Sequence, residues 1–216
     1  MTSVAGDLYD FPTVCPSGVS VLVADVMGHG VPAALVASMV KVAVSNGLKA
    51  SREPSSVIAG LNATLCEAAH EQYVTAVYMY LDTATRVGRY ASAAQPPGLV
   101  WRRGRQTLER LDGAGLLLGV RPNESYAARD VSFEAGDRLL LYSDGLVEAE
   151  NAEGESFGDL ALPAFIQEKQ NLGAEQFVDL LLKNVLAWSR DGSMKGQEDD
   201  ITIVVIDMKD GAKSHL

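Results

Sequence analysis

The order of helix-like and strand-like segments is the feature that most limits what this chain can fold into. Helical patterns come in pairs and strand patterns come in runs, which favours an α+β fold built in layers over regular βαβ alternation. The pattern predicts helices at 31–46, 54–70, 160–169 and 174–189, and strands at 19–24, 74–81, 87–93, 99–102, 138–143 and 201–206. We expect a single domain over 1–208, followed by a polar tail over 209–216.

Charge and cysteine content exclude several classes of function. The formal net charge is −10, which argues against nucleic-acid binding because that requires a basic surface. Cys15 and Cys66 form no spaced set, so neither a disulfide framework nor a zinc site is expected. No apolar run is long enough to span a bilayer and the first residues do not resemble a signal peptide, so a cytoplasmic setting is expected.

Four aspartates share one local setting at the ends of predicted strands. Asp7 lies in G-D-L-Y-D, Asp25 ends a strand before V-M-G-H-G, Asp144 ends a strand before a glycine, and Asp199 precedes the last strand in E-D-D-I-T. An aspartate before a glycine is by itself an ordinary turn signal. Together, however, carboxylates at strand ends can converge at one rim of a sheet, where they repel one another unless a cation lies between them. Oxygen ligands of this kind suit magnesium or manganese.

Four motifs occur in a fixed order along the chain: G-D-L-Y-D-F, A-D-V-M-G-H-G-V-P-A-A-L, L-L-Y-S-D-G-L-V-E-A and E-D-D-I-T-I-V-V. From Ala5 to about Met208 the chain resembles the PPM-type metal-dependent serine/threonine protein phosphatases, and within them the bacterial SpoIIE/RsbU-like branch. The resemblance implies a four-layer αββα sandwich, in which an antiparallel β-sandwich is flanked by helix pairs. It also implies hydrolysis of phosphoserine or phosphothreonine on a protein. The implied substrate is a phosphorylated anti-sigma-factor antagonist, a STAS-type domain, in a partner-switching circuit.

The resemblance further implies a centre with two divalent cations, Mn2+ or Mg2+. Asp25 would bridge the two cations. Asp7 and the backbone carbonyl of Val26 would hold the second, and Asp144 and Asp199 would hold the first. Two such cations would lower the pKa of a shared water molecule and clamp the phosphate oxygens for in-line attack.

Other motif positions have less certain roles. Asp200 and Thr202 would lie beside the metal ligands. His29 could donate a proton to the leaving oxygen or could be a loop histidine that hydrogen-bonds the turn. Asp10 matches a motif position, but a loop-capping role is equally open.

The chain departs from the family pattern at three places. The family's G-G-D is Ala5-Gly6-Asp7, and its A-G-H-P-P is 93–97 with Gln95 in place of histidine, which could alter substrate contacts. Family members usually have a strand before G-G-D, so this chain is expected to be part of a longer regulator, a minimal member or a shortened form. A missing edge strand would expose hydrogen-bonding groups and favour a homodimer. The helix at 31–46, apolar on more than one face and expected to be well covered, is the candidate switch for an upstream sensor or activator.

Two alternatives remain open at this stage. The strand at 19–24 followed by G-H-G-V-P-A and a helix satisfies the dinucleotide-binding pattern G-x-G-x-x-A. Against it, Asp25 would repel a pyrophosphate, and the expected acid-ending second strand is absent. The other alternative is a catalytically silent family member that acts as a partner-binding module.

Overall fold

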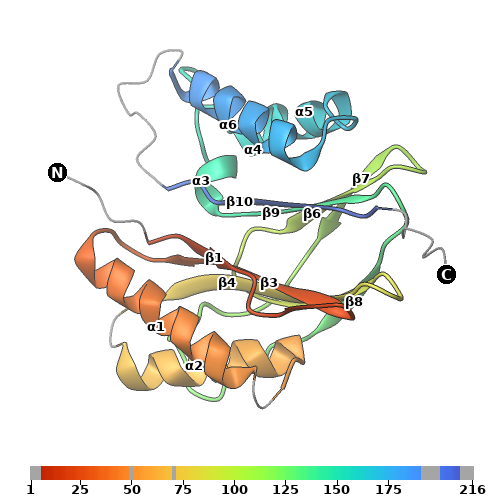
Figure 1. Cartoon of the computed structure of the whole chain (residues 1–216). Helices are drawn as coiled ribbons and strands as arrows, with labels where there is room; N and C mark the ends of the chain where they lie inside the picture. Colours follow the sequence, from red (N-terminus) through yellow and green to blue (C-terminus); the bar gives the residue numbers. More distant parts are fainter. Residues whose placement is uncertain (1–5, 49–50, 70–71, 191–199, 210–216) are drawn as a thin grey trace.

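Two antiparallel sheets pack face to face, and each is covered on its outer side by helices (Figure 1). The computed structural model describes residues 6–48, 51–69, 72–190 and 200–209. One sheet has six strands in the order β1-β3-β4-β5-β8, with β2 also paired to β3, and the other has four in the order β10-β9-β6-β7. This arrangement confirms the predicted α+β sandwich.

The strands of the two sheets are interleaved along the chain, because β8 of the first sheet follows β6 and β7 of the second. The six-stranded sheet consists of β1 (Leu8–Asp10), β2 (Val14–Cys15), β3 (Gly18–Val26), β4 (Val74–Asp82), β5 (Val87–Ala93) and β8 (Arg129–Ser132). The four-stranded sheet consists of β6 (Gly98–Arg102), β7 (Thr107–Leu111), β9 (Arg138–Tyr142) and β10 (Ile203–Asp207). The helices are α1 (Val31–Gly47), α2 (Pro54–Ala68), α3 (Asp144–Val147), α4 (Phe157–Leu160), α5 (Leu162–Glu168) and α6 (Ala174–Arg190).

The central strands are apolar on both faces because each lies between two layers. In β3, Leu22 and Ala24 pack into the core beneath α1 and α2, whereas Val21 and Val23 pack into the core between the sheets. Successive side chains of a strand point to opposite faces, so a strand with both faces buried has a continuous apolar run. This explains why the central strands could be predicted from sequence.

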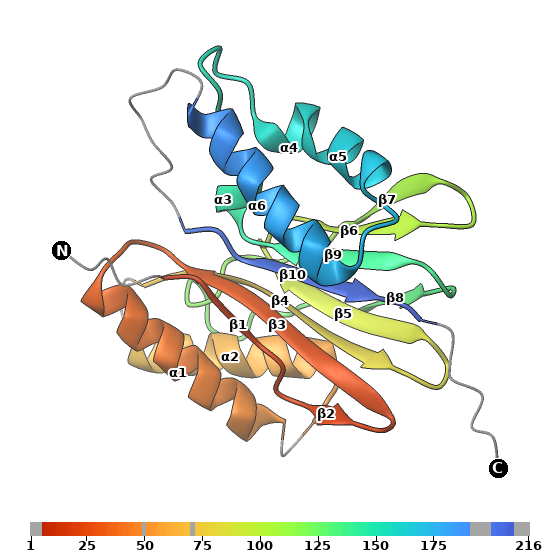
Figure 2. The ribbon, with the colours of Figure 1, turned by 45° about the horizontal axis from the view of Figure 1, so that its top comes forward.

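Strand β9 repeats this arrangement in the other sheet. Leu139 and Leu141 face the first sheet, and Leu140 faces Phe165 and Phe177 of the helical layer. Figure 2 shows α4, α5 and α6 lying together over this sheet. Strand β9 is therefore enclosed between the other sheet and the outer helices. Polar groups at its two ends need hydrogen-bond partners because water is largely excluded there.

The segment from β3 to α1 excludes one alternative and corrects one expectation. The dinucleotide-binding interpretation requires β3 and its successor to be parallel, but β3 pairs antiparallel with both β1 and β4. The expected full cover of α1 is also absent, because Val31, Leu35 and Val42 are 64%, 63% and 61% exposed. The helix therefore presents an apolar stripe to solvent.

Within the described ranges, no helix has the length and apolar character needed to cross a membrane.

Candidate metal centre

Asp7 and Asp25 come together through the pairing of β1 with β3. The register places Leu8 opposite Ala24, and continuing it by one residue places Asp7 opposite Asp25. A Cβ atom on Gly6 would lie 2.7 Å from the carbonyl oxygen of Val26 and 3.5 Å from Asp25 Oδ1. The backbone at Gly6 therefore approaches two of the predicted ligands so closely that only glycine fits there.

The loop after β3 turns the chain sharply into α1. Gly28 and Gly30 have φ angles of 95° and 80°, in the region that glycine adopts without steric cost. The loop leaves His29 exposed, and within the described part of the chain its side chain makes no hydrogen bond. The turn-bonding role for His29 is therefore not seen, and the proton-donor role stays a prediction. Asp10 does accept a hydrogen bond from the backbone N–H of Phe11 (3.0 Å), as its capping role requires.

Ser143 connects the second sheet to the first at this end of the sandwich. Strand β9 ends at Tyr142, one residue earlier than predicted, and Asp144 begins α3 rather than ending the strand. The hydroxyl of Ser143 donates to Asp7 Oδ2 (2.5 Å) and accepts from the N–H of Thr202 (2.9 Å). Ser143 is completely buried, so this one hydroxyl fixes three segments that are distant in sequence.

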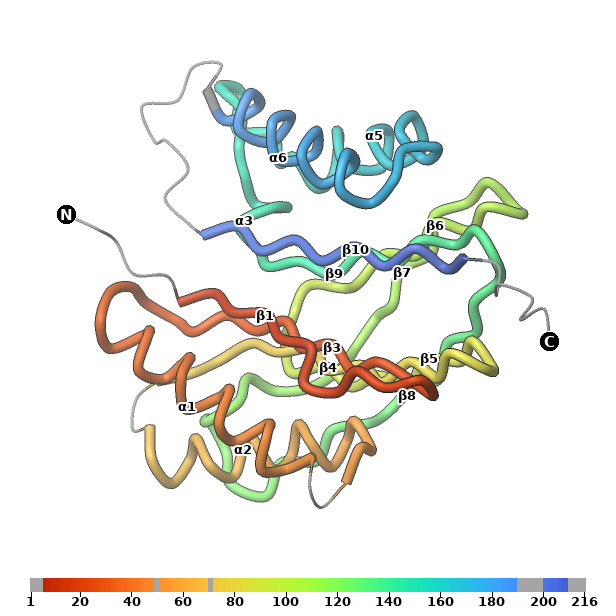
Figure 3. Tube along the Cα trace, viewed as in Figure 1, coloured from red at the N-terminus to blue at the C-terminus, as the bar shows by residue number. Residues whose placement is uncertain are grey.

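A second contact joins the segment before β1 to the segment before β10. The N–H of Gly6 donates to Asp200 Oδ2 (3.2 Å). In the chain trace, the starts of β1 and β10 lie at the same end of the sandwich as α3 (Figure 3). The structure thus brings Asp7, Asp25, Val26, Asp144, Asp200 and Thr202 to one end, whereas Asp199 lies outside the described residues.

Gln95 forms a third connection between the sheets. Its side chain is 4% exposed. Its carbonyl oxygen accepts from Thr75 Oγ1 (2.7 Å), and its amide nitrogen donates to the carbonyl of Tyr142 (2.9 Å). Thr75 lies opposite Asp25 in the β3–β4 pairing, and Tyr142 directly precedes Ser143. Gln95 is thus a buried strut between two carboxylate-bearing strand ends, and the effect of the missing histidine on substrate contacts stays a prediction.

The sequence showed these polar residues but not their partners. Ser143 belongs to a motif, and Gln95 stands where the family motif has a histidine. Both residues lie beside predicted strand ends, and that position is the only sequence feature that points to them. The partners are 136 and 47 residues away in the chain, and no local pattern encodes such a distance.

The donor set fits a hard divalent cation. Asp7 Oδ1 and Asp144 Oδ1 are buried oxygen atoms at this end, and the Val26 carbonyl lies beside the close approach of Gly6. Carboxylate and carbonyl oxygens are the ligands that magnesium and manganese prefer. Within the described ranges no three Asp, Glu, His or Cys side chains form a complete metal-holding group. The predicted set also needs Asp199, beyond those ranges, and a backbone oxygen.

Burial also controls the ionisation of Tyr142, which ends β9 at this centre. Its desolvation raises the pKa of the phenol to about 12. The neutral hydroxyl donates to the carbonyl of Pro97 (2.7 Å). Tyr142 therefore acts as an uncharged hydrogen-bond donor that holds the segment after Gln95 against β9.

Known proteins share this sequence pattern and this fold. The family described as Stage II sporulation protein E (SpoIIE) matches residues 16–209. The phosphoserine phosphatase RsbU of Bacillus subtilis (strain 168) is 30% identical over 211 residues, which are 95% of this chain and 60% of RsbU. The chain thus spans less than two thirds of that relative.

Solved structures show the same architecture at lower identity. The SiaA-PP2C domain of Pseudomonas aeruginosa superposes with a TM-score of 0.83 at 20% identity, covering 94% of this chain and 80% of that one. RsbX, solved in complex with magnesium, gives a TM-score of 0.68 at 16% identity over 94% of this chain and 86% of its own. At these identities the likeness shows the fold alone. The family match and the shared fold together lead to one conclusion: the chain belongs to the SpoIIE family, within the SpoIIE/RsbU-like branch of the PPM-type phosphatases.

Proposed function

We propose that this chain is a metal-dependent protein serine/threonine phosphatase. The observation that carries the proposal is the convergence at one end of the sandwich, where the Ser143 hydroxyl joins Asp7 to the segments that contain Asp144 and Thr202. Partly buried carboxylates held together in this way are suited to a cation-assisted reaction. Membership of a family that includes a named phosphoserine phosphatase supports the same reaction.

In this proposal two divalent cations would be held by five residues: Asp7, Asp25, Asp144, Asp199 and Val26 through its carbonyl. Asp7 and the Val26 carbonyl lie on the side of the first sheet, and Asp144 lies on the side of the second. Bound divalent cations supply a water molecule of lowered pKa and stabilise charge on the phosphate oxygens. The chain itself orients the carboxylates through Ser143, Gly6 and Gln95. His29, exposed on the adjoining loop, is the proposed proton donor to the leaving serine or threonine oxygen.

The proposed cations are Mn2+ or Mg2+. The magnesium in RsbX supports this class of ion. The oxygen-only donor set of this chain supports it independently.

The proposed substrate is a phosphorylated STAS-type anti-sigma-factor antagonist in a partner-switching circuit. The relation to RsbU supports this assignment. We also propose that an upstream sensor or activator regulates the chain, and that it can form a homodimer. The exposed stripe of Val31, Leu35 and Val42 on α1 is the surface we propose for such regulation. The single domain over 1–208 and the cytoplasmic setting stay predictions.

The silent-module alternative has lost part of its support. It rested partly on the altered A-A-Q-P-P segment. Gln95, however, is buried and doubly hydrogen-bonded rather than missing a function at the surface. The departure is thus compatible with an intact centre.

The test measures phosphate release from a phosphoserine protein and from an aryl phosphate, with and without manganese. Wild type is compared with Asp25→Asn and Asp144→Asn, and with Asp130→Asn, an exposed aspartate far from the centre that serves as the matched control. We expect manganese-dependent turnover in wild type and the control and its loss in both centre variants. No turnover with any cation from a folded chain would overturn the proposal and favour the silent module.

A further inference from the structure

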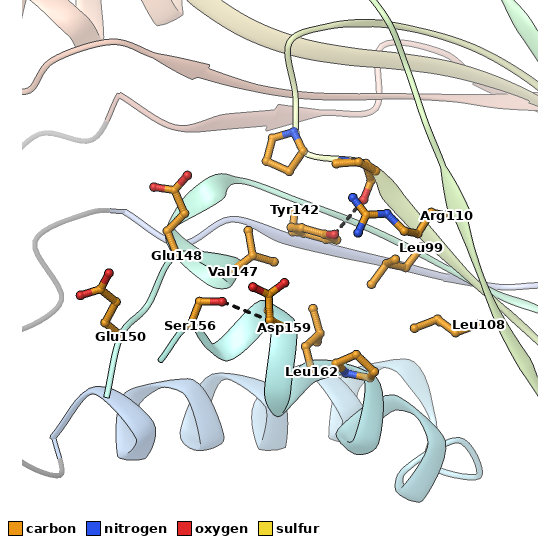
Figure 4. Close-up of a pocket in the computed structure, with 14 residues that line it drawn as sticks. Leu99, Leu108, Arg110, Tyr142, Val147, Glu148, Glu150, Ser156, Asp159 and Leu162 are labelled. Carbon is orange, nitrogen blue, oxygen red and sulfur yellow. Dashed lines mark hydrogen bonds between the residues drawn. The ribbon is translucent and has the colours of Figure 1, made fainter. Parts of the chain in front are cut away.

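A pocket of about 520 Å³ opens between the four-stranded sheet and the short helices α3–α5 (Figure 4). We call it the side pocket. Leu99 and Leu108 form its wall on the sheet side, and Val147 and Leu162 form its wall on the helix side. These apolar walls suit the stem of a long side chain, and polar groups make up the rest of the lining.

The side pocket begins close to the candidate metal centre. Val147 and Glu148 line it, and they follow Asp144 by three and four residues in and after α3. At 1.5 Å per residue that separation is about 5–6 Å along the helix axis. Pro97, on the opposite side, follows the strut residue Gln95 by two residues. A ligand at the centre could therefore extend into this pocket.

The charges at the side pocket are mostly negative. Glu148, Glu150 and Asp159 lie along the helix side of the pocket, and Arg110 lies across from them (Figure 4). Arg110 already has an acidic neighbour, since its Nε lies 3.7 Å from Asp112 Oδ1. In contrast, the side-chain carboxylates of Glu150 and Asp159 make no hydrogen bond or ion pair within the described ranges. The pocket therefore combines apolar walls with an acidic rim, in which Glu150 and Asp159 have no counter-charge within the described ranges.

Lysine and arginine match this combination. Both place an aliphatic stem on apolar surface while the charged head stays near water. An acidic or phosphorylated side chain would instead meet the three rim carboxylates. A purely aliphatic side chain would fill the interior but would desolvate the rim without compensation.

We propose that the side pocket binds a lysine or arginine side chain of the phosphoprotein substrate, close in sequence to the phosphorylated residue. This inference rests on the proposed function and adds a specificity determinant to it. An extended chain advances about 3.3–3.6 Å per residue. The distance from the metal centre to the side pocket is taken as slightly more than the ~5–6 Å along α3. An extended substrate covers that distance with about two or three residues, which gives the separation of the basic residue from the phosphoserine.

Matched phosphopeptides test the inference. Three peptides differ only in carrying Lys, Leu or Glu at the second and third positions on either side of the phosphoserine. For wild type we expect kcat/KM to be about fivefold higher for the Lys peptide than for the Leu peptide, as two partly exposed ion pairs can provide, and lowest for the Glu peptide. The Lys advantage should shrink as salt is raised from low to physiological ionic strength.

Variants of the rim then assign the effect to this pocket. The double variant Glu150→Gln with Asp159→Asn should lose the Lys advantage, and Glu150→Lys with Asp159→Lys should prefer the Glu peptide. The control Glu153→Gln changes an exposed acid of the same segment that does not line the pocket, so it should retain the Lys advantage. An aryl phosphate bound at the metal centre is too short to extend into the pocket, so its turnover should be equal in all four proteins.

The outcomes separate the two proposals. Aryl phosphate turnover with equal kcat/KM for the three peptides, or with a Leu preference, would overturn the side-pocket inference and leave the phosphatase intact. The side-pocket inference would also be overturned if the rim variants kept the wild-type preference for the Lys peptide. If no substrate is hydrolysed, fluorescence anisotropy of the three labelled peptides with the same variants measures the preference directly. A Lys preference that depends on Glu150 and Asp159 then supports the pocket without the activity.

Discussion

Acidic groups lie near both ends of strand β9, and their partners differ. At its start, Asp137 accepts from Arg102 Nη1 (3.0 Å), and Arg138 donates from Nε to Asp207 Oδ1 (2.6 Å). At its end, Asp7 accepts from the neutral Ser143 hydroxyl and Asp200 from the backbone N–H of Gly6. The first end contains arginine counter-charges, whereas Asp7 and Asp200 at the second end accept hydrogen bonds from a hydroxyl and a backbone N–H.

The difference separates a structural clamp from a candidate site. A buried carboxylate paired with arginine stays ionised because the pair and its hydrogen bonds compensate the desolvation. Neutral donors fix the position of a carboxylate but leave its charge to attract a cation. Removing an acid should therefore damage the fold at the first end and metal binding at the second.

The largest expected effect is on the stability of the clamp. Asp137 is 2% exposed and also accepts from the backbone N–H groups of Arg103 and Glu134. Because Asp137→Ala leaves Arg102 and these donors without their acceptor, the free energy of unfolding should fall by about 3–5 kcal/mol. Urea denaturation of metal-free protein measures this, with the exposed Asp130→Asn as control. A loss below about 1 kcal/mol would contradict the clamp.

The opposite behaviour is expected for Asp25→Asn. The free energy of unfolding of the metal-free protein should change by less than about 1 kcal/mol, because the amide keeps the shape of the carboxylate. In wild type, manganese at 100 times its dissociation constant should stabilise the fold by about 2.7 kcal/mol. That increment should vanish in the variant, as thermal denaturation with and without manganese would reveal. Equal stabilisation of both proteins would mean that the cation binds elsewhere.

Ser143→Ala tests whether neutral donors organise the candidate site. The change removes the donor to Asp7 and the acceptor for the Thr202 N–H, both buried, so the free energy of unfolding should fall by about 1–3 kcal/mol. Manganese affinity, measured by calorimetry, should also weaken because Asp7 loses its fixed orientation. Ser143→Thr, which keeps the hydroxyl, is the matched control. Unchanged affinity in Ser143→Ala would mean that the hydroxyl only supports the fold.

The sequence predicts the segments that are buried on both faces, but it does not predict contacts between residues that are distant in the chain. Segments buried on both faces, such as β3 and β9, have apolar runs that gave their strands to within two residues. Strands β7 and β8 were missed because they lie at sheet edges and are mostly exposed and polar. The aspartate positions could be predicted through motifs, but the linking roles of Ser143 and Gln95 depend on partners that only the folded chain brings together.

The smallest expected effect comes from Tyr142, at the site end of β9. Tyr142→Phe removes the hydrogen bond to the Pro97 carbonyl and should lower the free energy of unfolding by about 1 kcal/mol at pH 7. Burial raises the phenol pKa to about 12 in the folded chain, above its usual value near 10. Proton binding by Tyr142 therefore stabilises the fold fully below about pH 10, and this contribution is lost as the pH rises towards 12.

The pH dependence distinguishes Tyr142 from the other buried tyrosines, which include Tyr126. The pKa of Tyr126 is also raised to about 12 by its burial, and it is present in both proteins, so the difference between wild type and variant isolates Tyr142. Between pH 10 and 12, wild type should lose about 2 kcal/mol more unfolding free energy than Tyr142→Phe, so the variant becomes the more stable protein at the alkaline limit. Parallel curves over this range would show that folding does not raise the pKa of the Tyr142 phenol, and that the site end of β9 is accessible to water.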